Sequence, residues 1–191
     1  DGMIKNLNLG VYGRVNLENA VAALAVAVKL GVDSDKLRKG LENYKGVWRR
    51  FDVQIDREDL IFIDDYAHHP AEIKAFVGSV KEALPGKRLC GVFQPPLYSR
   101  TRDFALGFAE SLSMLHDVVL LDIYPAREKP IEGVSSELIL KQLKNMGERR
   151  LSSKDELINT IDSLHPEVLL TMGAGDIDKL VKPLKSHLEV A

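Results

Sequence analysis

Apolar and polar positions change period repeatedly along this chain, and each period indicates a type of secondary structure. From Phe51 onward, short apolar runs rich in β-branched residues alternate with longer stretches of helical periodicity. The short runs predict strands at residues 51–55, 60–63, 88–93, 118–123 and 168–172. The longer stretches predict helices at residues 70–83, 101–115, 135–144, 154–164 and 176–188.

This alternation of strands and helices predicts an α/β fold. Strands that are apolar on both faces are typical of a mostly parallel sheet with helices on both sides. Right-handed crossovers would connect such strands into a Rossmann-like, doubly wound module. The first two strands are joined only by the charged turn at residues 56–59, so a hairpin is the alternative arrangement for this pair.

The N-terminal part of the chain has a different pattern. Residues 3–9 alternate weakly, as a strand would. The alanine-rich residues 17–27 are almost continuously apolar, which predicts a buried helix with Asn16 as its N-cap and Gly31 just past its end. A second helix is expected at residues 34–44. Two helices and one strand are too little for a closed domain, so we expect further structure to cover them.

Polar residues gather directly after four of the predicted strands. These segments are residues 64–70, 94–100, 122–128 and 173–176. The carboxyl ends of parallel strands meet at one edge of a sheet, and doubly wound folds bind their ligands at that edge. We therefore expect the functional site there.

The heptapeptide at residues 64–70 concentrates the most chemistry. It offers four ligand or acid–base groups, Asp64, Asp65, His68 and His69. One interpretation is a Zn or Mn site of a metal-dependent phosphoesterase, for which Asp122 is the one obvious further ligand. A second is binding, in which a carboxylate holds a ribose and a histidine reaches an anionic substrate. A third is decoration of a helix N-terminus. Pro70 at the first helical position fits either a functional or a structural interpretation.

Three further segments carry weaker signals. Arg100 offers a planar fork for a carboxylate or phosphate, whereas Asp103 is placed to screen Arg102. Residues 173–176 indicate either an anion-binding loop or a tight turn. Residues 46–51 indicate a hinge with two cations; we expect one arginine to serve a phosphate and the other to be solvated. No Gly-x-x-x-x-Gly-Lys-Ser/Thr loop occurs in the sequence.

Composition narrows the class of protein. The 191 residues are 45% hydrophobic and 28% charged, as in globular domains, and suggest one large domain or a domain plus an appendage. The net charge of -2 gives no basic excess for nucleic acid. The single Cys90 lies in an apolar run, which favours a buried thiol in a reducing compartment. No apolar run approaches the ~20 residues of a membrane span. The first residue is not methionine, so we expect a piece of a longer protein.

Several segments, in order, resemble the Mur ligases of peptidoglycan synthesis. They are residues 13–19, 46–51, 64–70 and 93–101, with later landmarks at 122–128 and 173–176. The resemblance runs from about residue 10 to about residue 176. It is strongest to the branch that adds L-alanine, and Tyr66 separates that branch from the murein tripeptide ligases, which typically have phenylalanine there.

The resemblance implies a three-domain, cytoplasmic, bacterial enzyme more than twice this length. With ATP and Mg²⁺ it would phosphorylate the carboxylate of UDP-N-acetylmuramate, and the amine of L-alanine would attack the acyl phosphate. Residues 1–47 would be the C-terminal remnant of the central ATP-binding domain, and residues 48–191 the C-terminal amino-acid-binding Rossmann-like domain. The phosphate loop and the magnesium ligands would lie outside this chain, which would be inactive alone.

The resemblance also implies roles for individual residues. Asn16 and Asn19 would contact the adenine end of ATP, Arg50 its terminal phosphates and Asp65 its ribose. The L-alanine pocket would contain Tyr66, His68 and Arg100, with Arg100 on the carboxylate. No catalytic residue and no metal ligand is assigned within the chain.

Three residues depart from the family pattern. Val15 and Pro96 stand where histidine is usual, and Leu97 stands where many members have a second arginine for the substrate carboxylate. Arg100 is then the one arginine left for that carboxylate. From the residues themselves, the metal-dependent phosphoesterase and a non-catalytic nucleotide-binding module remain alternatives.

Overall fold

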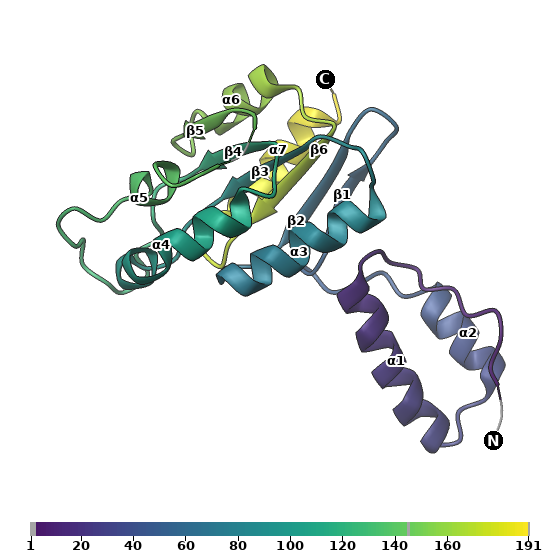
Figure 1. Cartoon of the computed structure of the whole chain (residues 1–191). Coiled ribbons are helices and arrows are strands. Elements are labelled where there is room, and N and C mark those ends of the chain that lie inside the picture. Colours follow the sequence, from purple (N-terminus) through teal and green to yellow (C-terminus); the bar gives the residue numbers. More distant parts are fainter. Residues whose placement is uncertain (1–2, 145, 191) are drawn as a thin grey trace.

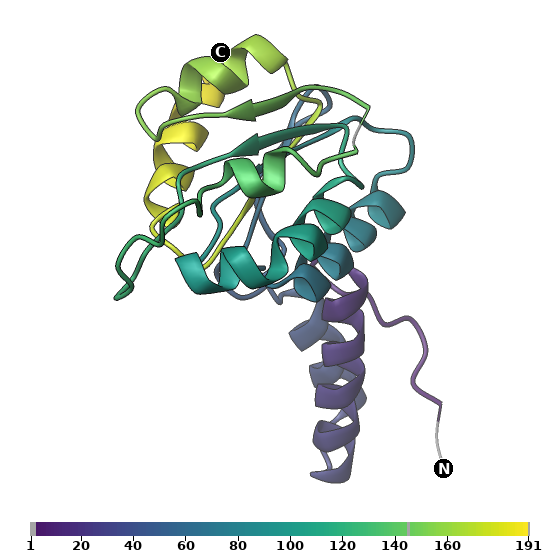
Figure 2. The same ribbon diagram turned by 60° about the vertical axis from the view of Figure 1, so that its left-hand side comes forward.

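A computed structural model describes residues 3–144 and 146–190 of the chain. Two helices, α1 (Arg14–Lys29) and α2 (Ser34–Glu42), pack against each other and project from the remainder as an N-terminal hairpin (Figures 1 and 2). The linker at residues 46–51 leads from this hairpin into an α/β unit, which we call the body. Among the described residues, no helix is both long enough and apolar enough to span a membrane.

The body is built on a six-stranded sheet. Its strands are β1 (Asp52–Asp56), β2 (Ile61–Asp65), β3 (Leu89–Phe93), β4 (Asp117–Leu120), β5 (Arg149–Leu151) and β6 (Val168–Met172). They lie in the order β1-β2-β6-β3-β4-β5. Of the described strands, only β1 runs antiparallel to its neighbour, so the hairpin alternative for the first two strands is confirmed, as is the mostly parallel sheet.

Helices cover both faces of the sheet, as predicted (Figure 1). On one face lie α3 (Pro70–Ala83), α4 (Tyr98–Leu112) and the short α5 (Glu137–Leu140); on the other lie α6 (Leu157–Leu164) and α7 (Asp178–Leu188). The strands feed both cores by alternation: Ile63 packs with α3 and α4, and its neighbour Phe62 packs with α6 and α7. The Rossmann-like fold class is confirmed.

Most boundaries agree with the sequence, and the exceptions have physical reasons. The helix predicted at 135–144 is reduced to the four residues of α5. Strand β5 was not predicted, because it is a three-residue edge strand with two arginines and no apolar run. The strand predicted at 3–9 is wrong: this segment is irregular, and its Lys5 carbonyl accepts a bond from Arg38 Nε of α2 at 3.1 Å.

The start of α1 differs from the prediction as well. Gly13 is the N-cap, and its φ of 99° turns the chain into the helix before Asn16 is reached. Asn16 instead lies within the first turn, and its side-chain amide donates to the Tyr12 carbonyl at 2.7 Å. Asn16 as N-cap is therefore wrong, whereas Gly31, with φ 76°, lies just past the end of the helix as predicted.

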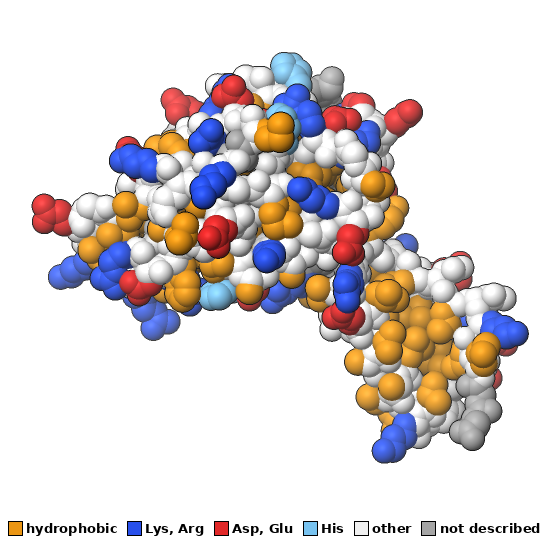
Figure 3. Space-filling model, viewed as in Figure 1, with side chains coloured by type: hydrophobic (Ala, Val, Ile, Leu, Met, Phe, Trp, Pro, Cys, Tyr) orange, Lys and Arg blue, Asp and Glu red, His pale blue; other side chains and the backbone are white. Residues whose placement is uncertain are grey.

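The prediction that α1 is buried is also wrong for the described residues. None of its side chains is buried, and an apolar surface spreads over the hairpin (Figure 3). The large apolar side chains at least half exposed on α1 are Val15, Leu17, Val21, Val26 and Val28. The stretch is apolar on most sides of the helix, and α2 is one short neighbour that contacts only one of them.

Candidate functional site

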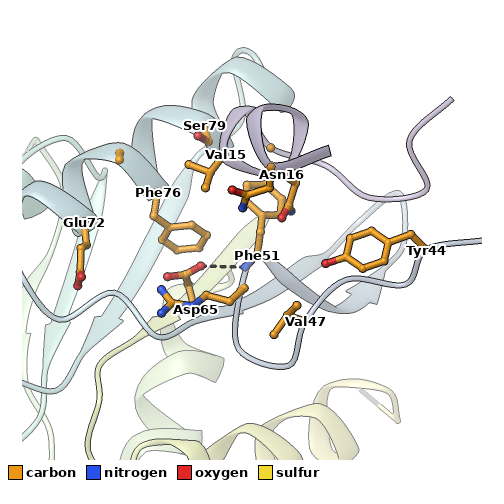
Figure 4. A pocket seen from close by; sticks show the side chains of 13 residues that line it. Val15, Asn16, Tyr44, Val47, Phe51, Asp65, Glu72, Phe76 and Ser79 are labelled. Carbon is orange, nitrogen blue, oxygen red and sulfur yellow. Dashed lines mark hydrogen bonds between the residues drawn. The ribbon is translucent and has the colours of Figure 1, made fainter. Parts of the chain in front are cut away.

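A cavity of about 500 Å³ lies where the N-terminal hairpin meets the body (Figure 4). Its walls come from the start of α1, the linker, the end of β2 and one side of α3. Four side chains for which the family resemblance implies nucleotide contacts lie around it: Asn16, Asn19, Arg50 and Asp65. Asn16 and Asp65 are distant in the sequence, so it is the fold that brings these groups together.

The cavity combines an apolar wall with hydrogen-bonding groups. The rings of Phe51 and Phe76 meet edge to face, with their centroids 5.6 Å apart. Asn16 and Asn19, three residues apart on α1, lie on the same side of that helix. Such a surface suits a flat ligand that is apolar on its faces and polar at its edges, as a nucleotide base is.

Asp65 is buried at the end of β2, with 8% of its surface exposed. Its Oδ2 accepts the Phe51 N–H at 2.8 Å, and its Oδ1 accepts the Ala67 N–H at 2.8 Å. Burial raises the pKa of Asp65, while these two donors and the charge of Arg50 act in the opposite direction. Asp65 thus ties the linker to β2, and a ligand in the cavity has access only to the remaining lone pairs of the carboxylate.

Asp64 forms a buried ion pair with Arg49. Arg49 Nε donates to Asp64 Oδ2 at 2.9 Å, and the Thr171 hydroxyl donates to Asp64 Oδ1 at 2.6 Å. Burial raises the pKa of Asp64, against the effect of Thr171 and Arg49. We expected one of the two linker arginines to be solvated, and for Arg49 this is wrong, since it is 4% exposed. Arg49 is buried because the buried Asp64 carboxylate requires a compensating cation.

Val47, Trp48 and Arg50 of the linker face outward, whereas Phe51 is buried. Arg50 is exposed, and within the described residues its side chain makes no hydrogen bond or ion pair. Its guanidinium carbon lies 5.4 Å from the centroid of the Tyr66 ring, and that of Arg49 lies at 5.1 Å. Trp48 is 73% exposed. Among the described residues, Arg50 is therefore a cation at the edge of the cavity that contacts the Tyr66 ring but has no ion-pair partner.

The two histidines of the heptapeptide have different environments. His69 is the N-cap of α3: its ring nitrogen accepts the Ala71 N–H at 3.4 Å, and Glu72 returns a bond to the His69 N–H at 3.1 Å. Pro70 follows at the first helical position, as predicted. His68 Nδ1 donates to the Tyr66 carbonyl at 2.9 Å and lies 3.3 Å from Glu72 Oε2. In the tautomer with the proton on Nδ1, Nε2 is the acceptor.

The contacts of Asp64, Asp65 and His69 do not support the interpretation as a metal-dependent phosphoesterase. Asp64 and Asp65 are occupied by protein donors, and His69 caps a helix. Asp122 is exposed on the loop after a different strand. Within residues 3–144 and 146–190, no group of three His, Cys, Asp or Glu side chains is arranged to hold a metal ion.

The start of α4 is capped from another loop. Leu97, its N-cap residue, has φ 50° and no side-chain acceptor to offer. Glu128, on the loop after β4, instead accepts the Ser99 N–H at 2.9 Å and the Ser99 hydroxyl. Both bonds lower the pKa of Glu128, and the bond from the hydroxyl has the larger effect. A distant carboxylate thereby satisfies the helix end that precedes Arg100.

Arg100 lies in the first turn of α4 and is half-buried. Its side chain makes no hydrogen bond or ion pair with any described residue, whereas Arg102 pairs with Asp103 at 2.8 Å, as expected. One turn further along α4, the ring of Phe104 lies 5.1 Å from that of His69. Arg100 therefore sits on the stripe of α4 that faces the heptapeptide.

The glycine loop at residues 173–176 is a tight turn. A side chain at Gly175 would come within 2.5 Å of Gln94 Oε1, and Gly173 has φ 144°. Gln94 fills the space that these glycines leave, donating to Asp176 Oδ1 at 2.9 Å and accepting the Ile177 N–H at 2.9 Å. The alternative of an anion-binding loop loses support, because the Ile177 N–H at the start of α7 already donates to Gln94 Oε1.

Two supporting residues, Glu72 and Thr171, were missed from the sequence, and Gln94 was placed in a site segment without its supporting role. Glu72 carries a usable signal, since a polar cap residue followed three positions later by glutamate marks a helix start. Thr171 is the one hydroxyl in an otherwise apolar strand. Nothing in the sequence pairs it with Asp64, 107 positions away.

Comparison with known proteins connects this geometry to a family. The family model described as Mur ligase, glutamate ligase domain, matches residues 49–175. The UDP-N-acetylmuramate–L-alanine ligase of Porphyromonas gingivalis strain W83 is 52% identical over 192 residues, covering 98% of this chain and 41% of the relative. That of Parabacteroides distasonis is 48% identical over 185 residues, covering 97% and 40%. The chain thus spans about two fifths of the length of these curated relatives.

Solved structures agree. The UDP-N-acetylmuramate–alanine ligase MurC of Thermotoga maritima superposes with a TM-score of 0.78 and 28% identity, covering 96% of this chain and 40% of that one. A murein peptide ligase of Psychrobacter arcticus shares the fold, with a TM-score of 0.62 and 23% identity over 95% and 38% of the two chains. Because the family model matches more than half of its residues, the chain belongs to the Mur ligase family, with its glutamate ligase domain at residues 49–175.

Proposed function

We propose that this chain is the part of a bacterial, cytoplasmic UDP-N-acetylmuramate–L-alanine ligase that binds L-alanine and completes the ATP site. The observation that carries the proposal is the gathering of Asn16, Asn19, Arg50 and Asp65 around one cavity. Residues 1–47 would belong to the central ATP-binding domain and residues 48–191 to the amino-acid-binding domain. The chain would be inactive alone, since its sequence holds no phosphate-binding loop.

The nucleotide half of the proposal follows from the chemistry of the cavity. The amides of Asn16 and Asn19 both donate and accept, so they match the polar edge of adenine beside the Phe51 and Phe76 rings. The free lone pairs of Asp65 accept from a ribose hydroxyl. Arg50 supplies a fork for the terminal phosphates, and its exposed, unpaired state among the described residues means that no ion pair must be broken first.

The amino-acid half rests on Tyr66, His68 and Arg100. Arg100 pairs with the L-alanine carboxylate, and its lack of a partner among the described residues leaves it available. His68 offers the Nε2 lone pair to the amino group, because Nδ1 is held by the Tyr66 carbonyl. Leu97 contributes no second arginine, so in this chain Arg100 is the arginine on which the carboxylate depends.

The reaction of the whole enzyme places a demand on this arrangement. The γ-phosphoryl group of ATP is transferred to the muramate carboxylate, the amine of L-alanine attacks the acyl phosphate, and ADP, phosphate and an amide result. An acyl phosphate is hydrolysed by water, so the parts on either side of the linker must close around it. Mg²⁺ would screen the phosphates; no described cluster of this chain is arranged to hold it, and we assign its ligands elsewhere in the enzyme.

The test is a calorimetric titration of the chain with ADP and, separately, with L-alanine. ADP should bind, and Arg50→Ala should weaken it roughly 10- to 100-fold, as the loss of a charge-assisted hydrogen bond predicts. Arg102→Ala is the matched control, since it removes the same charge from an exposed arginine that already pairs with Asp103. Equal ADP affinities of Arg50→Ala and the unmodified chain would overturn the nucleotide assignment. ADP binding without any L-alanine binding would favour a non-catalytic nucleotide module.

A further inference from the structure

We infer that Arg49 is a positioning residue that holds Arg50 at the nucleotide cavity. The inference rests on the proposed nucleotide role of Arg50. The two neighbouring arginines differ in exposure: the Arg49 side chain is buried, whereas the Arg50 side chain is exposed and lines the cavity.

The backbone of the linker explains how two adjacent arginines face opposite ways. Arg49 has φ 57° and Phe51 has φ 48°, so both residues flanking Arg50 adopt the left-handed region. Residues with side chains rarely adopt this region unless the surrounding structure holds them in it. Two such residues around one exposed arginine indicate a bend that requires a clamp.

Arg49 supplies that clamp through four hydrogen bonds. Its Nε donates to the buried Asp64 carboxylate at 2.9 Å, and its Nη2 donates to the Gly173 carbonyl. Its backbone N–H donates to Asp52 Oδ2 at 3.2 Å, and its carbonyl accepts the Tyr66 N–H at 2.8 Å. The contacts reach β1, the end of β2, the segment that follows it and the loop after β6, so Arg49 cannot move without disturbing the carboxyl-end edge of the sheet.

The other side of Arg50 is fixed as well. The Phe51 N–H donates to Asp65 Oδ2 at 2.8 Å (Figure 4), and Asp65 itself lines the cavity. The Arg50 backbone is therefore held between a clamp at Arg49 and a clasp at Phe51. Its side chain remains free to meet an anion from a fixed starting point, which lowers the cost of ordering it on binding.

An arginine is required at position 49 because two acceptors lie in different directions. The planar guanidinium donates to the Asp64 carboxylate and the Gly173 carbonyl together, whereas a lysine ammonium would keep the charge without the fork. Arg57 provides a matched control. It also donates to a carboxylate, Asp59, and to a backbone carbonyl, Leu188, but at the far end of the β1–β2 hairpin.

A double-mutant cycle on ADP affinity tests the inference. Arg49→Lys should weaken ADP binding about five- to tenfold, and the double variant Arg49→Lys/Arg50→Ala should bind no more weakly than Arg50→Ala alone, since the two act through one group. Arg57→Lys should leave ADP affinity unchanged. Additive losses from Arg49→Lys and Arg50→Ala, or an Arg49→Lys chain with full affinity, would overturn the inference.

A second measurement needs no variant. In proton-exchange NMR of the unmodified chain, the Arg49 Nε–H and the Phe51 and Tyr66 amides should exchange slowly. The Arg50 Nε–H should exchange as fast as that of Arg127, which is exposed and makes no hydrogen bond or ion pair with a described residue. Fast exchange at Arg49 Nε would show that the clamp is absent and sink the inference, even if Arg49→Lys does not fold. If the unmodified chain binds no ADP, the proposed function fails, and these exchange rates still decide whether Arg49 fixes the linker.

Discussion

Helices α1 and α3 are both rich in apolar residues, yet they have opposite fates. Helix α3 buries Ile73, Phe76, Val77, Ser79 and Val80 against the sheet and α4, whereas α1 has no buried residue. The difference lies in the neighbours, since α3 packs on a sheet and on a long helix, whereas the main neighbour of α1 among the described elements is the short α2. An apolar sequence pattern indicates that a helix has a surface to bury, but it does not indicate which element covers that surface. The cavity lies between the exposed N-terminal hairpin and the well-packed body.

The largest expected contrast between the two regions is in thiol chemistry. Cys90 is 1% exposed, and burial raises its pKa to about 12, so almost no thiolate is present at pH 8. A cysteine introduced by Ala23→Cys at this exposed position of α1 should have an ordinary pKa near ~8.5 and react with a thiol reagent about a thousandfold faster or more.

Labelling kinetics of the two cysteines at pH 8 make this comparison in one chain. The Cys90→Ala/Ala23→Cys variant isolates the α1 signal. Rapid labelling of Cys90 in the folded, unmodified chain would mean that the β3 core opens freely, and the contrast between the regions would disappear.

Core truncation should separate the regions by several kilocalories per mole. Phe108 is fully buried in α4, with the Phe93 ring centroid 5.2 Å away, so Phe108→Ala should lower the free energy of unfolding by about 3–5 kcal/mol. Leu17→Ala on α1, where the side chain is 56% exposed, should change it by less than about 0.5 kcal/mol. Urea unfolding monitored by circular dichroism measures both. A comparable loss from Leu17→Ala would reveal a partner for α1 in solution, such as a second copy of the chain.

The smallest expected effect concerns the cap of α4. Glu128 has a lowered pKa, so its contribution to stability is complete above the ordinary value of 4.5 and is lost as the pH falls through the lowered value. Glu128→Ala should reduce the melting temperature at pH 7 by less than the core change does, and Glu128→Gln, which keeps an acceptor, by less still. The gap between Glu128→Ala and the unmodified chain should narrow as the pH falls below 4.5 and through the lowered pKa of Glu128. A gap that stays constant down to pH 3 would remove the charge of Glu128 from the explanation.

How much the sequence predicts depends on how local the cause is. Helix α3 was predicted with its observed bounds, because Pro70 and the polar residues around it mark its start locally. The burial of Arg49 was not predictable, because it depends on Asp64 and on Gly173, which is 124 positions away. Likewise Asn16 was expected to cap α1, but the conformation of Gly13 starts the helix earlier. The sequence indicated segments that line the cavity, whereas the residues that support them became visible only in the fold.

The exposed position of Trp48 has a practical consequence. It is the only tryptophan of the chain and stands beside the clamped Arg49, where the hairpin joins the body. At 73% exposure its indole should fluoresce as it does in water, and closure of the two regions around a ligand would move it into a less polar setting. The chain therefore carries an intrinsic fluorophore where the hairpin meets the body. A shift of its emission on adding ADP would report the proposed closure without an added label.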